Sequence, residues 1–110
     1  MSRIFLFCLL VCNSYSLLAS ITPLAEFGDN PGNLSAELLL PDEVNQYPAL
    51  VVLLHGCGQQ AKPFARQSGF IEQAHSSKFA LLLPQQSQSN NEHLCFNWYN
   101  EQDTKLNSGE

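Results

Sequence analysis

An uninterrupted apolar run, residues 49–54, ends abruptly at the sequence His-Gly-Cys-Gly, residues 55–58. The run is too short for a buried helix and is rich in leucine and valine, which is typical of a strand. Because neither face of the run carries a polar residue, it predicts a central strand of a sheet that is covered on both faces. The glycines that follow predict a turn whose backbone another group can approach closely.

The chain has 110 residues, which allows one small domain at most. A content of 45% hydrophobic and 14% charged residues is typical of a globular protein rather than a disordered one. The formal net charge is −5, and only five lysines and arginines are present. Phosphate binding needs a clustered basic face, so the composition argues against nucleic acid as a partner.

The first twenty residues differ from the rest of the chain. Arg3 precedes an apolar segment at residues 4–12, a polar stretch follows, and the small residues Ala19 and Ser20 offer a cleavage site. This order predicts a signal peptide over residues 1–20 and export to the periplasm or the medium. The apolar segment is too short to span a bilayer, so no stable membrane anchor is expected. A buried N-terminal helix is the alternative.

Export changes the cysteine count, because Cys8 and Cys12 leave with the signal peptide. Cys57 and Cys95 then remain as a single pair in an oxidising compartment, which predicts a disulfide between them. Two free buried thiols are the alternative. The cysteines show no metal-like spacing, and we expect neither a metal nor a cofactor.

The remaining pattern predicts an α/β fold. Residues 34–40 alternate apolar with polar side chains, which indicates a half-exposed edge strand that stops at Pro41. Apolar residues at helical spacing from position 61 to 74 predict a helix with a break at Ser68-Gly69. Residues 79–83 form a second short apolar run. Strand, helix and strand predict a right-handed crossover between parallel strands, and the polar residues 85–91 predict a surface loop.

Five blocks in order carry a family resemblance. They are Gly-Asp-Asn-Pro-Gly-Asn-Leu at residues 28–34, the run that ends His-Gly-Cys-Gly-Gln at 59, Ser-Gly-Phe at 68–70, Leu-Pro-Gln-Gln at 83–86 and Cys-Phe-Asn-Trp-Tyr at 95–99. Together they resemble the N-terminal part of the secreted poly(3-hydroxyalkanoate) depolymerase family, which includes feruloyl and acetylxylan esterases. The resemblance covers residues 27–110 and implies a partial α/β-hydrolase domain there.

The resemblance also implies roles for individual residues. The backbone N–H of Cys57, positioned by His55 and Gly56, is expected to form part of an oxyanion hole for ester substrates. The His55 side chain is expected to organise the loop rather than to act as a base. Trp98 and Tyr99 are expected either to line the acyl cleft or to pack beneath the disulfide.

Other parts of the family's machinery have no counterpart in the chain. The family uses a Ser-His-Asp triad, yet no Gly-x-Ser-x-Gly motif occurs, and Leu106 stands where the first glycine before Ser108 belongs. His75 and His93 are expected at the surface, so we expect no catalytic residue in this chain.

Two interpretations follow. One is a truncated secreted serine esterase of the depolymerase type, inactive by itself. The other is a short secreted binding or structural module. The ending Asn-Ser-Gly-Glu at residues 107–110 is typical of a helix start and favours the first.

Overall fold

The computed structural model describes residues 20–109, and the predicted signal peptide with Cys8 and Cys12 lies outside them apart from Ser20. The described elements follow in the order β1 (Ile21–Pro23), β2 (Ser35–Leu39), β3 (Leu50–Val52), α1 (Ala61–Gln67), α2 (Phe70–Ser77) and β4 (Ala80–Gln85). No helix among them is long and apolar enough to cross a membrane.

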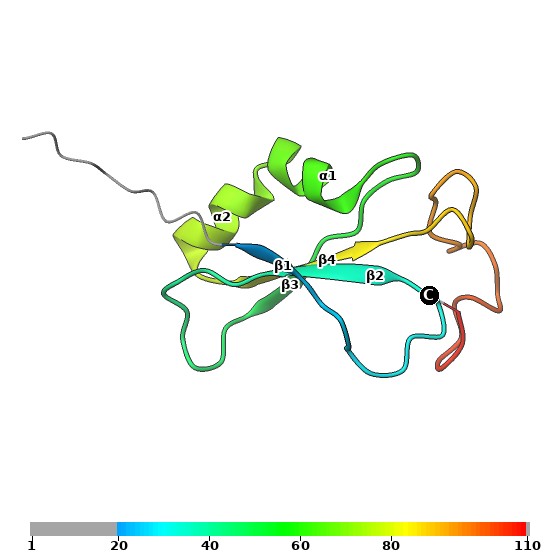
Figure 1. The fold of residues 1–110 in the computed structure, drawn as a ribbon, viewed down its shortest axis with the longest axis horizontal. Helices are drawn as coiled ribbons and strands as arrows, with labels where there is room; N and C mark the ends of the chain where they lie inside the picture. Colours follow the sequence, from blue (N-terminus) through cyan, green and yellow to red (C-terminus); the bar gives the residue numbers. More distant parts are fainter. Residues whose placement is uncertain (1–19, 110) are drawn as a thin grey trace, which may run out of the picture.

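The strands form one mixed sheet in the order β1-β2-β4-β3 (Figure 1). β1 and β4 both pair antiparallel with β2, whereas β3 and β4 are parallel neighbours joined through α1 and α2. The α/β class and the strand-helix-strand crossover are therefore confirmed. The strand expected at the sheet edge, β2, instead lies between two partners, because β1 pairs along its outer side.

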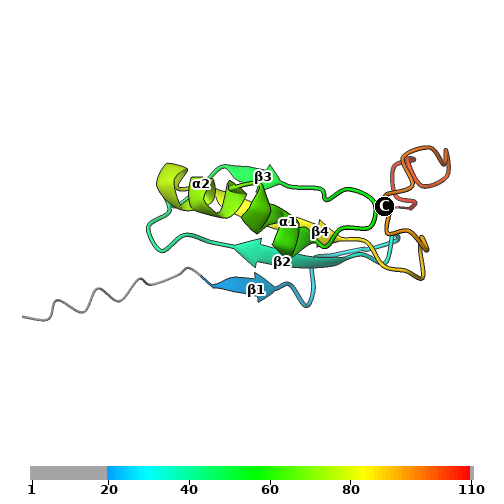
Figure 2. The ribbon, with the colours of Figure 1, turned by 90° about the horizontal axis from the view of Figure 1, so that it is seen from above.

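Both helices lie on one face of the sheet and run along β4 (Figure 2). Leu39 and Val51 are both in register with Leu81, so these side chains share the helix-covered face. There they pack with alanines of the helices, Ala61, Ala65 and Ala74, which are at most 2% exposed. The small alanine side chains allow the helices to approach the sheet closely.

The helix break occurs where the sequence predicts it. Gly69 adopts a left-handed backbone, φ 77°, between the end of α1 and the start of α2. This conformation is inexpensive for glycine, which has no Cβ, and it ends α1 so that a second helix begins at Phe70. The segment after it returns the chain to β4.

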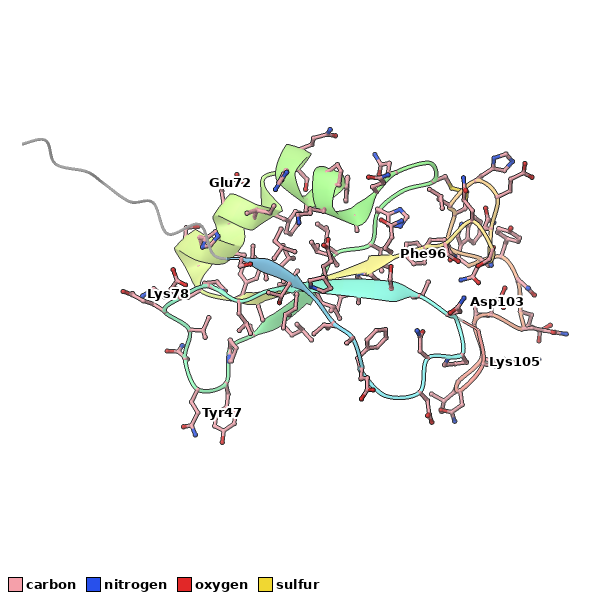
Figure 3. The ribbon with its side chains drawn as sticks, viewed as in Figure 1. Tyr47, Glu72, Lys78, Phe96, Asp103 and Lys105 are labelled. Carbon is pink, nitrogen blue, oxygen red and sulfur yellow. A yellow bond between two sulfur atoms is a disulfide. The ribbon has the colours of Figure 1, made fainter. Side chains whose placement is uncertain are left out.

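The opposite face of the sheet differs from the prediction. Leu50, Val52 and Leu54 are 58%, 50% and 55% exposed, and β3 is an edge strand of the described sheet. Residues 49–54 are therefore not a central strand covered on both faces within the described part. The loop between β2 and β3 lies on the side of the sheet away from the helices, and Tyr47, 86% exposed, is at its tip (Figure 3).

Two local details of the structure add to the sequence prediction. In β2 the most buried side chain is Leu39, fully buried on the helix face, whereas Leu40 is 43% exposed. The apolar alternation through Leu40 therefore identified only one of the two apolar faces of this strand. Near the end of the described chain, Asn107 and Gly109 have left-handed φ values of 63° and 72°, and the helix expected to open at Gly109-Glu110 is not tested within residues 20–109.

Candidate functional site

A four-residue turn, Gly56 to Gln59, follows the carboxyl end of β3. The Gly56 N–H donates to Oε1 of Gln59 at 2.7 Å, and the Gln59 N–H donates back to the Gly56 carbonyl at 3.1 Å. The Gly58 N–H donates to the His93 carbonyl at 2.7 Å. The N–H of Cys57 donates to no acceptor within residues 20–109. The turn therefore keeps one backbone donor unused.

Glycine is required at positions 56 and 58 of the turn for different structural reasons. Gly58 has φ +68°, the left-handed region that side chains rarely adopt. At Gly56 a Cβ would lie 2.9 Å from Oε1 of Gln59, the atom that accepts its N–H bond. Glycine at position 56 therefore makes room for the side chain that caps the turn.

His55 is buried, 4% exposed, and both of its ring nitrogens are occupied. Nδ1 lies 2.8 Å from the Gly56 carbonyl, and Nε2 lies 3.1 Å from the backbone nitrogen of Gln86. A ring whose nitrogens both bind protein groups has no lone pair or proton to offer a substrate. This geometry agrees with a loop-organising imidazole rather than a base.

The contact between His55 and the Gly56 carbonyl also orients the N–H of Cys57. A trans peptide is planar, so the carbonyl of Gly56 and the N–H of Cys57 point in opposite directions. Nδ1 of His55 and the Gln59 N–H both contact that carbonyl. The Cys57 N–H is consequently directed away from these partners, where an oxygen that carries negative charge can accept a hydrogen bond.

The disulfide Cys57–Cys95 is present and is confirmed, so the alternative of two free thiols is wrong. It joins the turn to a loop at residues 91–99, which the side chain of Asn91 organises. Oδ1 of Asn91 accepts the N–H groups of His93 at 2.9 Å and Cys95 at 3.3 Å. The disulfide and the Gly58–His93 hydrogen bond therefore attach the turn to the same loop twice.

The aromatic residues of this loop have unequal surroundings. Phe96, beside the end of β4 in Figure 3, lies against the His55 ring with centroids 5.0 Å apart. Trp98 and Tyr99 meet edge to face and are 77% and 64% exposed, so neither is buried beneath the disulfide. Trp98 lines a mainly apolar pocket of about 240 Å³ together with Leu54 and Phe96.

The rings of the other two histidines, His75 and His93, form no hydrogen bond with this turn within residues 20–109. His93 is exposed and contributes its backbone carbonyl, and His75 is half-buried in the last turn of α2. Within residues 20–109 no group of three or more His, Cys, Asp or Glu side chains could hold a metal ion.

Sequence reasoning missed Gln85 and Gln86, which were assigned to a polar surface loop. Gln86 is 2% exposed, and its buried backbone and side chain contact His55 and the loop of Cys95. The available signal was their position: polar residues directly after a strand of an α/β sheet lie at its carboxyl edge, where sites form.

The order β1-β2-β4-β3, with a parallel crossover and a glycine turn after β3, defines the front part of an α/β-hydrolase sheet. The acetyl xylan esterase from Aspergillus awamori has a similar structure, with a TM-score of 0.55 and 25% identity over 59% of this chain and 24% of that chain.

The family model described as Esterase PHB depolymerase matches residues 34–110, and the chain belongs to this esterase family. Poly(3-hydroxyalkanoate) depolymerase C from Paucimonas lemoignei is 37% identical over 97 residues, which are 88% of this chain and 23% of the relative. Feruloyl esterase B from Talaromyces funiculosus is 30% identical over 93 residues, 84% of this chain and 26% of the relative. The chain thus spans about a quarter of the length of these relatives.

Proposed function

We propose that this chain supplies the oxyanion-binding part of a secreted serine carboxylic-ester hydrolase of the polyhydroxyalkanoate depolymerase type. The observation that carries the proposal is the unused N–H of Cys57, held outward at the carboxyl end of β3 by the grip on the Gly56 carbonyl. When a nucleophile attacks an ester, the carbonyl oxygen becomes negative, and a fixed donor stabilises that charge more than it stabilises the neutral ester.

The substrates proposed for the whole protein are polyesters or the acyl esters of plant cell walls. Two of its relatives are named for these classes, a poly(3-hydroxyalkanoate) depolymerase and a feruloyl esterase. Both classes present an ester carbonyl next to an apolar acyl group. Trp98 is proposed as a wall of the acyl cleft, since it lines the apolar pocket together with Leu54, which directly precedes His55. Tyr99 is proposed with it because the two rings pack edge to face.

The nucleophile, base and acid of the proposed Ser-His-Asp mechanism are assigned to no residue of this chain. No Gly-x-Ser-x-Gly motif is present, and the described serines lie in no strand-to-helix elbow of that sequence. An oxyanion donor without an attacking group gives little acceleration. We therefore propose that residues 1–110 alone do not turn over esters.

A non-catalytic secreted binding or structural module is the second candidate. A chimera distinguishes the two. Residues 20–110 of this chain replace the aligned segment of the Paucimonas lemoignei depolymerase C, and hydrolysis of poly(3-hydroxyalkanoate) is measured. Restored hydrolysis supports an esterase part. A folded, disulfide-bonded chimera without hydrolysis favours the module.

A further inference from the structure

Half-buried Gln85 and buried Gln86, at the end of β4, contact the His55 ring at Nε2, the nitrogen that does not face the turn. The Gln86 N–H and the Nε2 amide of Gln85 both lie 3.1 Å from Nε2 of His55. We call these three residues the glutamine–histidine hub. The proposed function assigns no role to the two glutamines, although Gln86 is almost completely buried.

We propose that Gln85 and Gln86 are positioning residues, which set the proton position on His55 and thereby the direction of the Cys57 N–H. The proposal rests on the oxyanion role of Cys57 given above and adds the residues that set its geometry. It has two steps, the first at the imidazole ring and the second at the peptide that follows it.

The first step follows from donor chemistry. A backbone N–H can only donate, so the Gln86 N–H requires Nε2 of His55 to be an unprotonated acceptor. A neutral imidazole then carries its proton on Nδ1. Gln85 reinforces this state, because its Oε1 accepts the Ala61 N–H at 2.7 Å and its Nε2 is thereby turned toward the ring. If the side-chain amide of Gln85 were flipped, its NH2 group would face the Ala61 N–H, and two hydrogen-bond donors would then point at each other.

The second step links the proton to the turn. With the proton on Nδ1, His55 donates to the Gly56 carbonyl at 2.8 Å. In the other tautomer a lone pair of Nδ1 would face that carbonyl oxygen, and the proton on Nε2 would face the Gln86 N–H. Both contacts would be repulsive, so the Gly56–Cys57 peptide would lose its grip. The hub therefore connects the start of α1, through Ala61, to the proposed oxyanion donor.

The hub is also tied to the disulfide loop. Nε2 of Gln86 donates to the Cys95 carbonyl at 3.1 Å, and Oε1 accepts the Ser87 N–H at 2.9 Å. These contacts fix the backbone of Gln86, whose N–H must stay aimed at the ring.

The test is a nitrogen-15 NMR measurement of the His55 ring in the full chain at neutral pH, assigned by the loss of its signals in His55→Gln. The proposal predicts an unprotonated Nε2 and a protonated Nδ1, with the Nδ1–H tautomer favoured about tenfold or more. A mixture of tautomers or a protonated Nε2 in the wild type overturns it.

The informative variant is Gln85→Glu, which keeps an acceptor for the Ala61 N–H but replaces the donor facing His55 by a carboxylate oxygen. It should move His55 toward a protonated Nε2. The matched control is Gln67→Glu on α1, an exposed residue with no side-chain hydrogen bond in the described chain, and it should leave the ring unchanged. Slow exchange of the Gly58 amide shows that each variant is folded.

An unchanged ring in folded Gln85→Glu overturns the assignment of Gln85. If that variant does not fold, Gln85→Met carries the same test, since it removes the donor without adding a charge. It should raise the fraction of the Nε2–H tautomer, and an unchanged fraction overturns the assignment of Gln85 as a positioning residue. None of these results depends on ester hydrolysis. A correct tautomer in an inactive chimera would therefore count against the proposed function and not against the hub.

Discussion

The stability that the Cys57–Cys95 disulfide provides can be worked out from the fold. The bond joins residues 38 apart in sequence, and closing a loop of that length in the unfolded chain corresponds to about 4 kcal/mol in the chain-entropy model. Cys57 is exposed and Cys95 half-buried, so replacing both by alanine buries little new surface and leaves little cavity. The free energy of unfolding of a small domain is about 5–15 kcal/mol, so loss of the disulfide would remove a large share of the stability.

Reduction should act mainly on the unfolded state. In the folded state the Gly58–His93 hydrogen bond and the Gln86–Cys95 contact still hold the same segments together. Urea unfolding followed by far-ultraviolet circular dichroism measures the change in oxidised and reduced protein. Trp98 is unsuitable as the reporter because it is already 77% exposed in the folded state. The double variant Cys57→Ala/Cys95→Ala should not respond to reductant. A difference below about 1 kcal/mol between oxidised and reduced protein would refute the chain-entropy reasoning.

Three further predictions follow from the proposed function, the core and the surface. The isolated chain should show no hydrolysis of p-nitrophenyl esters above background and no labelling by a fluorophosphonate probe; stoichiometric labelling of one serine would count against this. Leu81→Ala should lower the free energy of unfolding by about 2–5 kcal/mol because Leu81 is fully buried, whereas Leu106→Ala, at a site 92% exposed, should leave it unchanged. The hydrogen bond and charge of Lys78 lower the pKa of Glu43, so the contribution of this pair is present at neutral pH and is lost as the pH falls through that lowered pKa. Glu43→Gln should therefore differ from the wild type in stability at pH 7 and converge with it in strong acid; a difference that persists in acid would contradict the assignment.

The crossover was predictable because its signals are local. A short apolar run, a helical repeat broken at a glycine and a second apolar run specify strand, helix and strand almost independently of the rest of the chain. Gly69 shows why the break could also be placed, since its left-handed backbone is a property of the residue itself.

The position of each strand in the sheet was less predictable, because it depends on pairing between distant segments. β2 became an interior strand only because Ile21 to Pro23, just after the predicted cleavage site, pairs along it. The apolar faces of residues 50–54 indicated cover on both sides, yet α1 and α2 cover only one face within the described part. Apolar content alone does not say which segment supplies the cover.

The turn and its disulfide were predictable from the sequence, whereas the side chains that support the turn were not. The glycines and the cysteine pair pointed to the turn and to its disulfide. The burial of Gln86 could not be predicted from the sequence, because glutamine is usually exposed and is buried only where its polar atoms find hydrogen-bond partners. Its partners, the ring of His55 and the carbonyl of Cys95, come from two other parts of the chain.

The central claim is that the N–H of Cys57 binds the developing oxyanion, and the chimera with the Paucimonas lemoignei depolymerase tests it directly. Cys57→Pro/Cys95→Ala lacks both the disulfide and the N–H, whereas Cys57→Ala/Cys95→Ala lacks only the disulfide. With both variants shown to be folded by circular dichroism, the proline variant should have a kcat about 100- to 1000-fold lower than the alanine variant. Equal kcat values in the two folded variants would contradict the claim.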